Sequence, residues 1–208
     1  MEININKMFQ DKNKEIFKNS LTLEMERNLE ALKNTTDNCV ALEINKLIIF
    51  FKKYFLESNI TYKKEELFGL LYREKTKINN IVNSKIEEKK QKIKEEFLDK
   101  ETKEDIISED YLDEYYNVLT SKTNQLNEEL DILLKTEICT EFSKEIISKY
   151  KLTTKEQEER IHSRINILFK DTIIRRIKEE TIFRDESLKN MCLESYKKYI
   201  ELNKQTIG

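Results

Sequence analysis

Arginine, whose forked guanidinium can form two hydrogen bonds to a phosphate or a carboxylate, is concentrated in one stretch of this sequence. Five of the seven arginines lie between residues 160 and 184. At about 100° per residue, a helix over about 155–184 would place four basic side chains within a sector of about 60°. These four are Arg160, Arg164, Arg175 and Lys178. Such a basic stripe could contact the phosphates of a nucleic acid, another anion or a protein partner.

The charge of the preceding segment favours a structural role for this basic stripe. Residues 109–158 contain 12 acidic and 6 basic residues, whereas residues 160–184 contain 7 basic and 3 acidic residues. Opposite charges help to fix the register of an antiparallel helix pair. Asp171 lies within the stripe, where it would repel a phosphate and can pair with Arg175. We therefore expect the arginines to pair with the acidic segment, and nucleic-acid binding is the alternative.

The side chains that usually perform catalysis or hold metals form no recognisable set. Glu159 and His162 have the E-x-x-H spacing of di-iron bundles, but that site needs a second motif and His162 is the only histidine. Cys39, Cys139 and Cys192 are far apart and include no CxxC pair, which argues against a zinc site and a disulfide framework. We predict no metal site and no catalytic residue.

Glycine and proline are almost absent. The chain has no proline and two glycines, of which Gly69 is the only internal one. The sequence has too few glycines to contain either of the common glycine-rich nucleotide-binding loops. We therefore predict no cofactor and no enzymatic activity. Hairpin turns and strand bulges also depend on glycine, which argues against a sheet-rich fold.

The overall composition is typical of long amphipathic helices. Charged residues make up 38% of the chain, compared with about a quarter in an average globular protein. A net charge of −2 excludes a globally basic nucleic-acid-binding protein, so any such role would be local. The longest strongly apolar run, residues 47–51, is far shorter than the roughly 20 residues that cross a bilayer. Without a signal-peptide pattern, we expect a cytoplasmic protein that does not bind membranes.

The first half of the chain predicts three long helices. From about Met8 to Lys33, apolar residues recur at the three-, four- and seven-residue intervals of an amphipathic helix. They are Phe9, Ile16, Phe17, Leu21, Met25, Leu29 and Leu32. Residues 34–38, NTTDN, predict an interruption because their side chains compete for backbone hydrogen bonds. Residues 39–58 are apolar around most of the circumference, which predicts a core helix packed on several sides. After a turn at Asn59, an apolar stripe predicts another helix from about Tyr62.

The second half predicts further helices with clear start signals. Ser108, followed by two acids, can cap a helix whose leucines recur every seven residues. The leucines are Leu112, Leu119, Leu126 and Leu133. This spacing fits both a coiled coil and an ordinary bundle. Thr154 and Gln157 have the form of a capping box, and a last helical stretch extends to about Asn203 with a break near residues 184–187.

These observations predict an all-α protein, an elongated antiparallel bundle of five or six long helices, with a coiled-coil section as one interpretation of the leucines. We expect a single helical domain over residues 1–208, with a subdivision near residues 100–108 as an alternative. The expected function is non-enzymatic: a structural or regulatory adaptor that binds a protein partner, or itself, through helix–helix interfaces. The alternative is nucleic-acid binding through the basic stripe.

Overall fold

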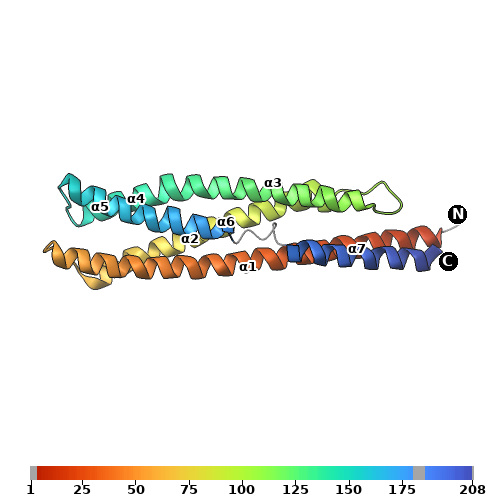
Figure 1. Cartoon of the computed structure of the whole chain (residues 1–208), viewed down its shortest axis with the longest axis horizontal. Helices are drawn as coiled ribbons and strands as arrows, with labels where there is room; N and C mark the ends of the chain where they lie inside the picture. The colour runs from red at the N-terminus through yellow and green to blue at the C-terminus, as the bar shows by residue number, and fades with distance from the viewer. Residues whose placement is uncertain (1–3, 180–185, 208) are drawn as a thin grey trace. The chain divides into compact units, whose positions relative to one another are not determined.

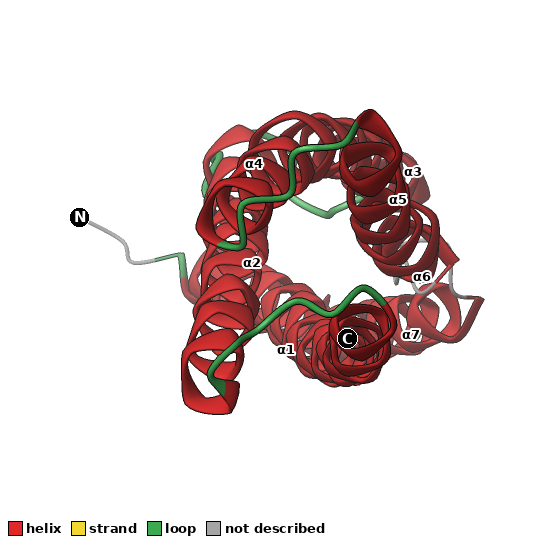
Figure 2. Cartoon of the chain, turned by 90° about the vertical axis from the view of Figure 1, so that its left-hand side faces the viewer, coloured by secondary structure: helices red, strands yellow, loops and turns green. Residues whose placement is uncertain are grey.

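The computed structural model describes residues 4–179 and 186–207, and every regular element in these residues is a helix. In chain order the elements are α1 (Ile5–Glu57), α2 (Lys64–Ile93), η1 (Lys94–Leu98), α3 (Glu109–Leu133), η2 (Leu134–Ile138), α4 (Cys139–Lys149), α5 (Lys155–Asn166), η3 (Ile167–Ile174), α6 (Arg175–Glu179) and α7 (Glu186–Ile207), where η marks a π-helical segment (Figure 1). Each π-helical segment continues the preceding α-helix without a break, so the described residues form five continuous helical segments. Figure 2 shows helices joined by loops and no strand in this part of the chain. The prediction of an all-α bundle is confirmed.

The residues group into two compact units, each built from four helical stretches. The first unit combines Met1–Ala31, Glu87–Asn124 and Thr181–Gly208, and the second combines Leu32–Ile86 and Gln125–Glu180. Helices α1, α2 and α3 each contribute residues to both units. The prediction of one domain over residues 1–208, with an alternative subdivision near 100–108, stays a prediction.

The predicted interruption at residues 34–38 is wrong, because α1 continues through it to Glu57. Thr36 is only 3% exposed and lies four residues from both Leu32 and Val40, which are also buried. Asp37, on the same turn, is 3.6 Å from the Lys75 ammonium of α2 and accepts a hydrogen bond from the Asn79 amide. Packing within the second unit therefore outweighs the local preference of NTTDN for a helix end.

The buried positions of α1 recur at eleven residues, which explains how one helix remains packed over its length. Buried pairs at this spacing are Leu21 and Leu32, Leu29 and Val40, Val40 and Phe51, and Ile44 and Phe55. An eleven-residue repeat corresponds to about 3.67 residues per turn, close to the 3.6 of a straight helix. In α3 the spacing is seven: Leu112, Leu119 and Leu126 are buried and Leu133 is half-buried. The coiled-coil section stays a prediction.

Several predicted helix ends are confirmed. α1 ends before Asn59, whose φ of 53° is a conformation that asparagine tolerates. The Thr154 hydroxyl accepts a hydrogen bond from the Gln157 N–H. In turn, the Gln157 side-chain oxygen accepts a hydrogen bond from the Thr154 N–H, which completes the capping box. The predicted break near residues 184–187 falls partly on residues 180–185, which lie outside the described residues, and α7 begins at Glu186.

Aromatic side chains fill the core of each unit. In the first unit, Phe17 of α1 stacks on Tyr199 of α7 at a centroid distance of 5.2 Å. The Tyr199 hydroxyl accepts a 2.8 Å hydrogen bond from the Ile107 N–H, which fixes the loop before α3. In the second unit, the Phe55 ring lies 4.6 Å from Tyr150 and 5.2 Å from Tyr62. No described helix combines the length and apolar character needed to cross a membrane.

Candidate interaction surfaces

Arg160 and Arg164, on α5, lie over aromatic rings of α1 in the second unit. The Arg160 Cζ is 4.8 Å from the centre of the Tyr54 ring, and the Arg164 Cζ is 5.5 Å from the centre of the Phe50 ring. Those two rings are stacked on each other, with centroids 5.7 Å apart and planes only 4° apart. An Arg160 Nη2 also lies 3.8 Å from Glu57 Oε2. We call these five side chains the arginine–aromatic cluster.

The position of this cluster differs from the expected pairing with the acidic segment. α4 and α5 are neighbours, as an antiparallel pair requires, but the contacts of Arg160 and Arg164 described above are with α1, outside residues 109–158. A planar and weakly hydrated guanidinium packs well on an aromatic face, which the charge pattern alone could not predict. These arginines therefore contribute to helix packing within the unit.

The other two residues of the predicted basic stripe lie beyond a π-helical segment. η3 separates α5 from α6, and one row of buried residues continues through it at intervals of four, at Ile161, Ile165, Phe169, Ile173 and Ile177. Leu168 and Ile174 are buried as well. Arg160 and Arg164 precede members of this buried row, whereas Lys178 follows one. A helix wound in this way does not keep the constant 100° per residue that the prediction assumed. The four basic side chains therefore do not share one face.

Arg175 has a local partner. Its Nε lies 3.7 Å from Glu179 Oε1, four residues later, and both side chains are more than half exposed. Among the described contacts of Arg175, this pair with Glu179 takes the place of the expected pair with Asp171. Whether Arg160, Arg164, Arg175 and Lys178 contact an anion or a partner stays a prediction.

An exposed apolar row lies on α1 in the second unit. Leu42, Ile49 and Leu56 are 56%, 68% and 79% exposed, respectively. Their spacing of seven residues is close to two helical turns, which places them within about 40° of one another. We call these three residues the second-unit row. The prediction that residues 39–58 form a core helix packed on several sides is therefore only partly correct, since one side of the helix faces solvent.

A second exposed apolar row lies on α1 in the first unit. Ile5, Phe9, Ile16 and Leu23 are between 50% and 61% exposed. They also fall within about 40° on a helix of 100° per residue. We call these four residues the first-unit row. Sequence analysis placed Phe9 and Ile16 with the apolar residues of an amphipathic helix, but the buried side carries Phe17, Leu21 and Met25 instead.

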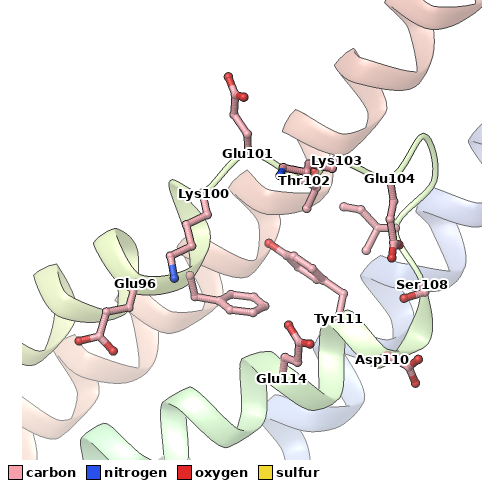
Figure 3. A pocket seen from close by; sticks show the side chains of 12 residues that line it. Glu96, Lys100, Glu101, Thr102, Lys103, Glu104, Ser108, Asp110, Tyr111 and Glu114 are labelled. Carbon is pink, nitrogen blue, oxygen red and sulfur yellow. The ribbon is translucent and has the colours of Figure 1, made fainter.

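A cavity of about 430 Å³ lies in the first unit, beside the loop between η1 and α3. Of its twelve lining residues, five are acidic and two are lysines. Figure 3 shows Tyr111 and Glu114 pointing toward the middle of the cavity, whereas Glu101 points away. Burial raises the pKa of the Tyr111 hydroxyl well above its usual value. The excess of acidic over basic lining residues favours cations over anions, and we assign the cavity no ligand.

A network of ion pairs joins α2 to α4 in the second unit. Lys77 Nζ donates a 2.9 Å hydrogen bond to Glu141 Oε2, and the Arg73 guanidinium pairs with the Glu145 carboxylate. Glu74, only 4% exposed, lies beside Arg73, with its Oε1 4.0 Å from Arg73 Nη2. Desolvation by burial raises the pKa of the Glu74 carboxyl, although Lys77 and Arg73 oppose this effect. The network contributes to the contact between the two helices.

The histidine and the cysteines occupy ordinary structural positions. His162 is exposed on α5. Cys139 and Cys192 are buried and Cys39 is half-buried. Burial raises the pKa of the Cys192 thiol to about 11, so this thiol is protonated at neutral pH and is a poor nucleophile. Among the described residues, no group of three or more potential ligands could hold a metal ion.

Comparison of the chain with protein-family models, with curated proteins and with solved structures finds no match. The functional assignment therefore depends on the chemistry of these surfaces. The apolar rows were the feature that sequence analysis missed. Their seven-residue spacing is visible in the sequence, but the apolar residues around them made the exposed and buried positions indistinguishable.

Proposed function

We propose that this protein is a non-enzymatic helical adaptor that binds protein partners through the exposed apolar rows of α1. The observation that carries the proposal is the second-unit row, Leu42, Ile49 and Leu56. Single exposed leucines are common on protein surfaces and need no explanation. A row of three on one face is different, because it has the spacing that a second helix needs in order to pack along the first.

The charges around the second-unit row favour an acidic partner. Lys46 and Lys53 have side chains that are 46% and 76% exposed, and Lys52 is also exposed. The only acid between residues 42 and 56 is Glu43, which is buried and lies 2.6 Å from Lys46. The partner that fits is an amphipathic helix whose apolar side covers the leucines and whose margins carry Asp or Glu.

Nucleic-acid binding through the basic residues receives less support from the geometry. Arg160 and Arg164 are engaged with the aromatic rings of α1, and the four basic side chains do not share a face. Phosphate binding predicts an affinity that falls steeply with salt, and this alternative can be checked with a labelled DNA or RNA oligonucleotide.

The proposed function can be tested by capturing partners in the cells that make the protein. The variant L42Q/I49Q/L56Q removes the second-unit row, and glutamine keeps a high helix propensity. The matched control N34Q/N38Q/N45Q places the same residue at three exposed, uncharged polar positions of the same helix and keeps the lysines around the row. A partner identified by mass spectrometry should be retained by the control and lost by the row variant. Equal recovery with both variants would contradict the proposal.

A further inference from the structure

We propose that Arg160 and Arg164 bind the acidic side chains of the partner helix, so that this helix lies along the α5 side of the second-unit row. The inference rests on the proposed function and deepens it, because it names the side of the row on which the partner carries its acids. The other side of the row borders α2, where Lys52 lies over the Phe68 ring. All of these residues belong to the second unit.

Two lysines and two arginines lie together on the α5 side of the row. At 100° per residue, Lys46 and Lys53 lie within about 60° of the middle of the row. They lie in the direction of Phe50, whose ring is covered by Arg164. Arg160 follows one turn away on α5. We call these four side chains the basic margin: Lys46, Lys53, Arg160 and Arg164.

The acids beside the basic margin do not balance its charge. Glu57 Oε1 lies 3.8 Å from Lys53 Nζ, and Glu57 Oε2 lies 3.8 Å from Arg160 Nη2, so one carboxylate is shared by two cations. Lys46 pairs with the buried Glu43. Four bases and these two acids give a net charge of +2. The margin therefore favours a partner that brings carboxylates.

Arg164 has donors that the second unit does not use. Its Cζ lies 5.5 Å from the centre of the Phe50 ring, and this contact forms no N–H···O hydrogen bond. Its Nε is buried and has no hydrogen-bond partner among the described residues. A buried donor without an acceptor is unfavourable. A carboxylate that accepts two bonds from the Nε–Nη edge of Arg164 would satisfy this donor and neutralise the charge.

The spacing of the arginines predicts the pattern of the partner. Arg160 and Arg164 are four residues apart, or about 6 Å along α5. Two acids at positions i and i+4 of a partner helix have the same spacing. Glu156, one turn before Arg160, marks the end of the basic margin. The occupant is therefore an amphipathic helix with apolar residues every seven positions and acids along one margin. A nucleic acid offers phosphates but no apolar side for the row.

A designed peptide tests which side of the row binds acids. The probe is a fluorescently labelled helical peptide with leucines every seven residues and glutamates at i and i+4 along one margin. It can dock in either direction, so its glutamates will lie on the side that binds them better. R160Q/R164Q removes two charges on the α5 side, and K52Q/K64Q removes the two lysines that lie over Phe68 on the α2 side. In fluorescence anisotropy, the first variant should weaken binding about fivefold or more and the second less than about twofold.

A conservative variant tests the role of the forked guanidinium. R160K/R164K keeps both charges but loses the forked donors, and should weaken binding about twofold or more. It decides the question if circular dichroism shows that R160Q/R164Q is not folded. Equal effects of the α5-side and α2-side variants, or no binding of the peptide to the unsubstituted protein, would overturn the inference. So would a DNA oligonucleotide that binds more tightly than the peptide and is lost in R160Q/R164Q.

The two proposals fail in distinguishable ways. If L42Q/I49Q/L56Q loses the peptide and R160Q/R164Q keeps it, the row binds a helix and only the role of the arginines is wrong. If the arginine variant loses the peptide and the row variant keeps it, the role assigned to the row is wrong and the basic margin remains an acid-binding surface.

Discussion

The two apolar rows of α1 differ in the charges around them, and this difference separates two kinds of contact. The first-unit row is accompanied by charges of both signs, with Lys12 and Glu30 near its margin. The second-unit row is flanked by exposed lysines, which suits a partner that supplies acids. Two rows of similar shape on one helix can therefore select different partners, because apolar burial provides affinity and charge determines specificity.

The largest expected effect is a loss of stability when a buried residue of α1 is shortened. It tests our assumption that the exposed apolar rows of α1 do not stabilise the fold. Phe51 is 0% exposed, so Phe51→Ala should lower the free energy of unfolding by about 3–5 kcal/mol. Ile49→Ala, two residues earlier but 68% exposed, should change it by less than about 0.5 kcal/mol. Urea unfolding followed by circular dichroism measures both. A large loss for Ile49→Ala would mean that the second-unit row is part of a core.

The sequence predicts the fold class well and the surfaces poorly, for physical reasons. The near absence of glycine and proline and the 3.6-residue periodicity are enough to predict a helical bundle. Thr154 and Gln157 predict the start of α5 because a capping box depends on a few neighbouring residues. Residues 34–38 could not be predicted, because Thr36 is buried by helices that are distant in sequence.

The π-helical segment η3 and the arginine–aromatic cluster show the same limit. A basic stripe calculated at a constant rotation of about 100° per residue is wrong once the number of residues per turn changes. The residue types of the segment ILFKDTII do not predict this change. The aromatic partners of Arg160 and Arg164 are about one hundred residues away in sequence. Local patterns predict which residues form a helix, whereas the faces left exposed depend on which other helices pack against it.

A further test concerns the packing of α5 on α1. The second-unit row can be the exposed side of α1 only if another side of this helix is buried by such packing. Arg160→Ala removes the contact with Tyr54 and the pair with Glu57, and should lower stability by about 0.5–1.5 kcal/mol. Arg175→Ala removes an exposed pair within one helix and should cost less than about 0.5 kcal/mol. Equal effects in thermal unfolding would indicate that the cluster does not stabilise the unit.

The smallest expected effect is a change in how stability depends on pH in the second unit. Burial raises the pKa of Glu74 above its usual 4.5, so the folded state holds this proton more tightly than the unfolded state. The stability contributed by the protonated carboxyl is therefore present at low pH and is lost as pH rises from about 4.5 through the raised pKa. Glu74→Gln keeps the shape of the side chain but removes its titration. The free energy of unfolding of this variant, relative to that of the unsubstituted protein, should therefore increase as pH rises over this range. Urea unfolding at several pH values measures the difference. A constant difference would mean that Lys77 and Arg73 already offset the effect of burial on the pKa of Glu74.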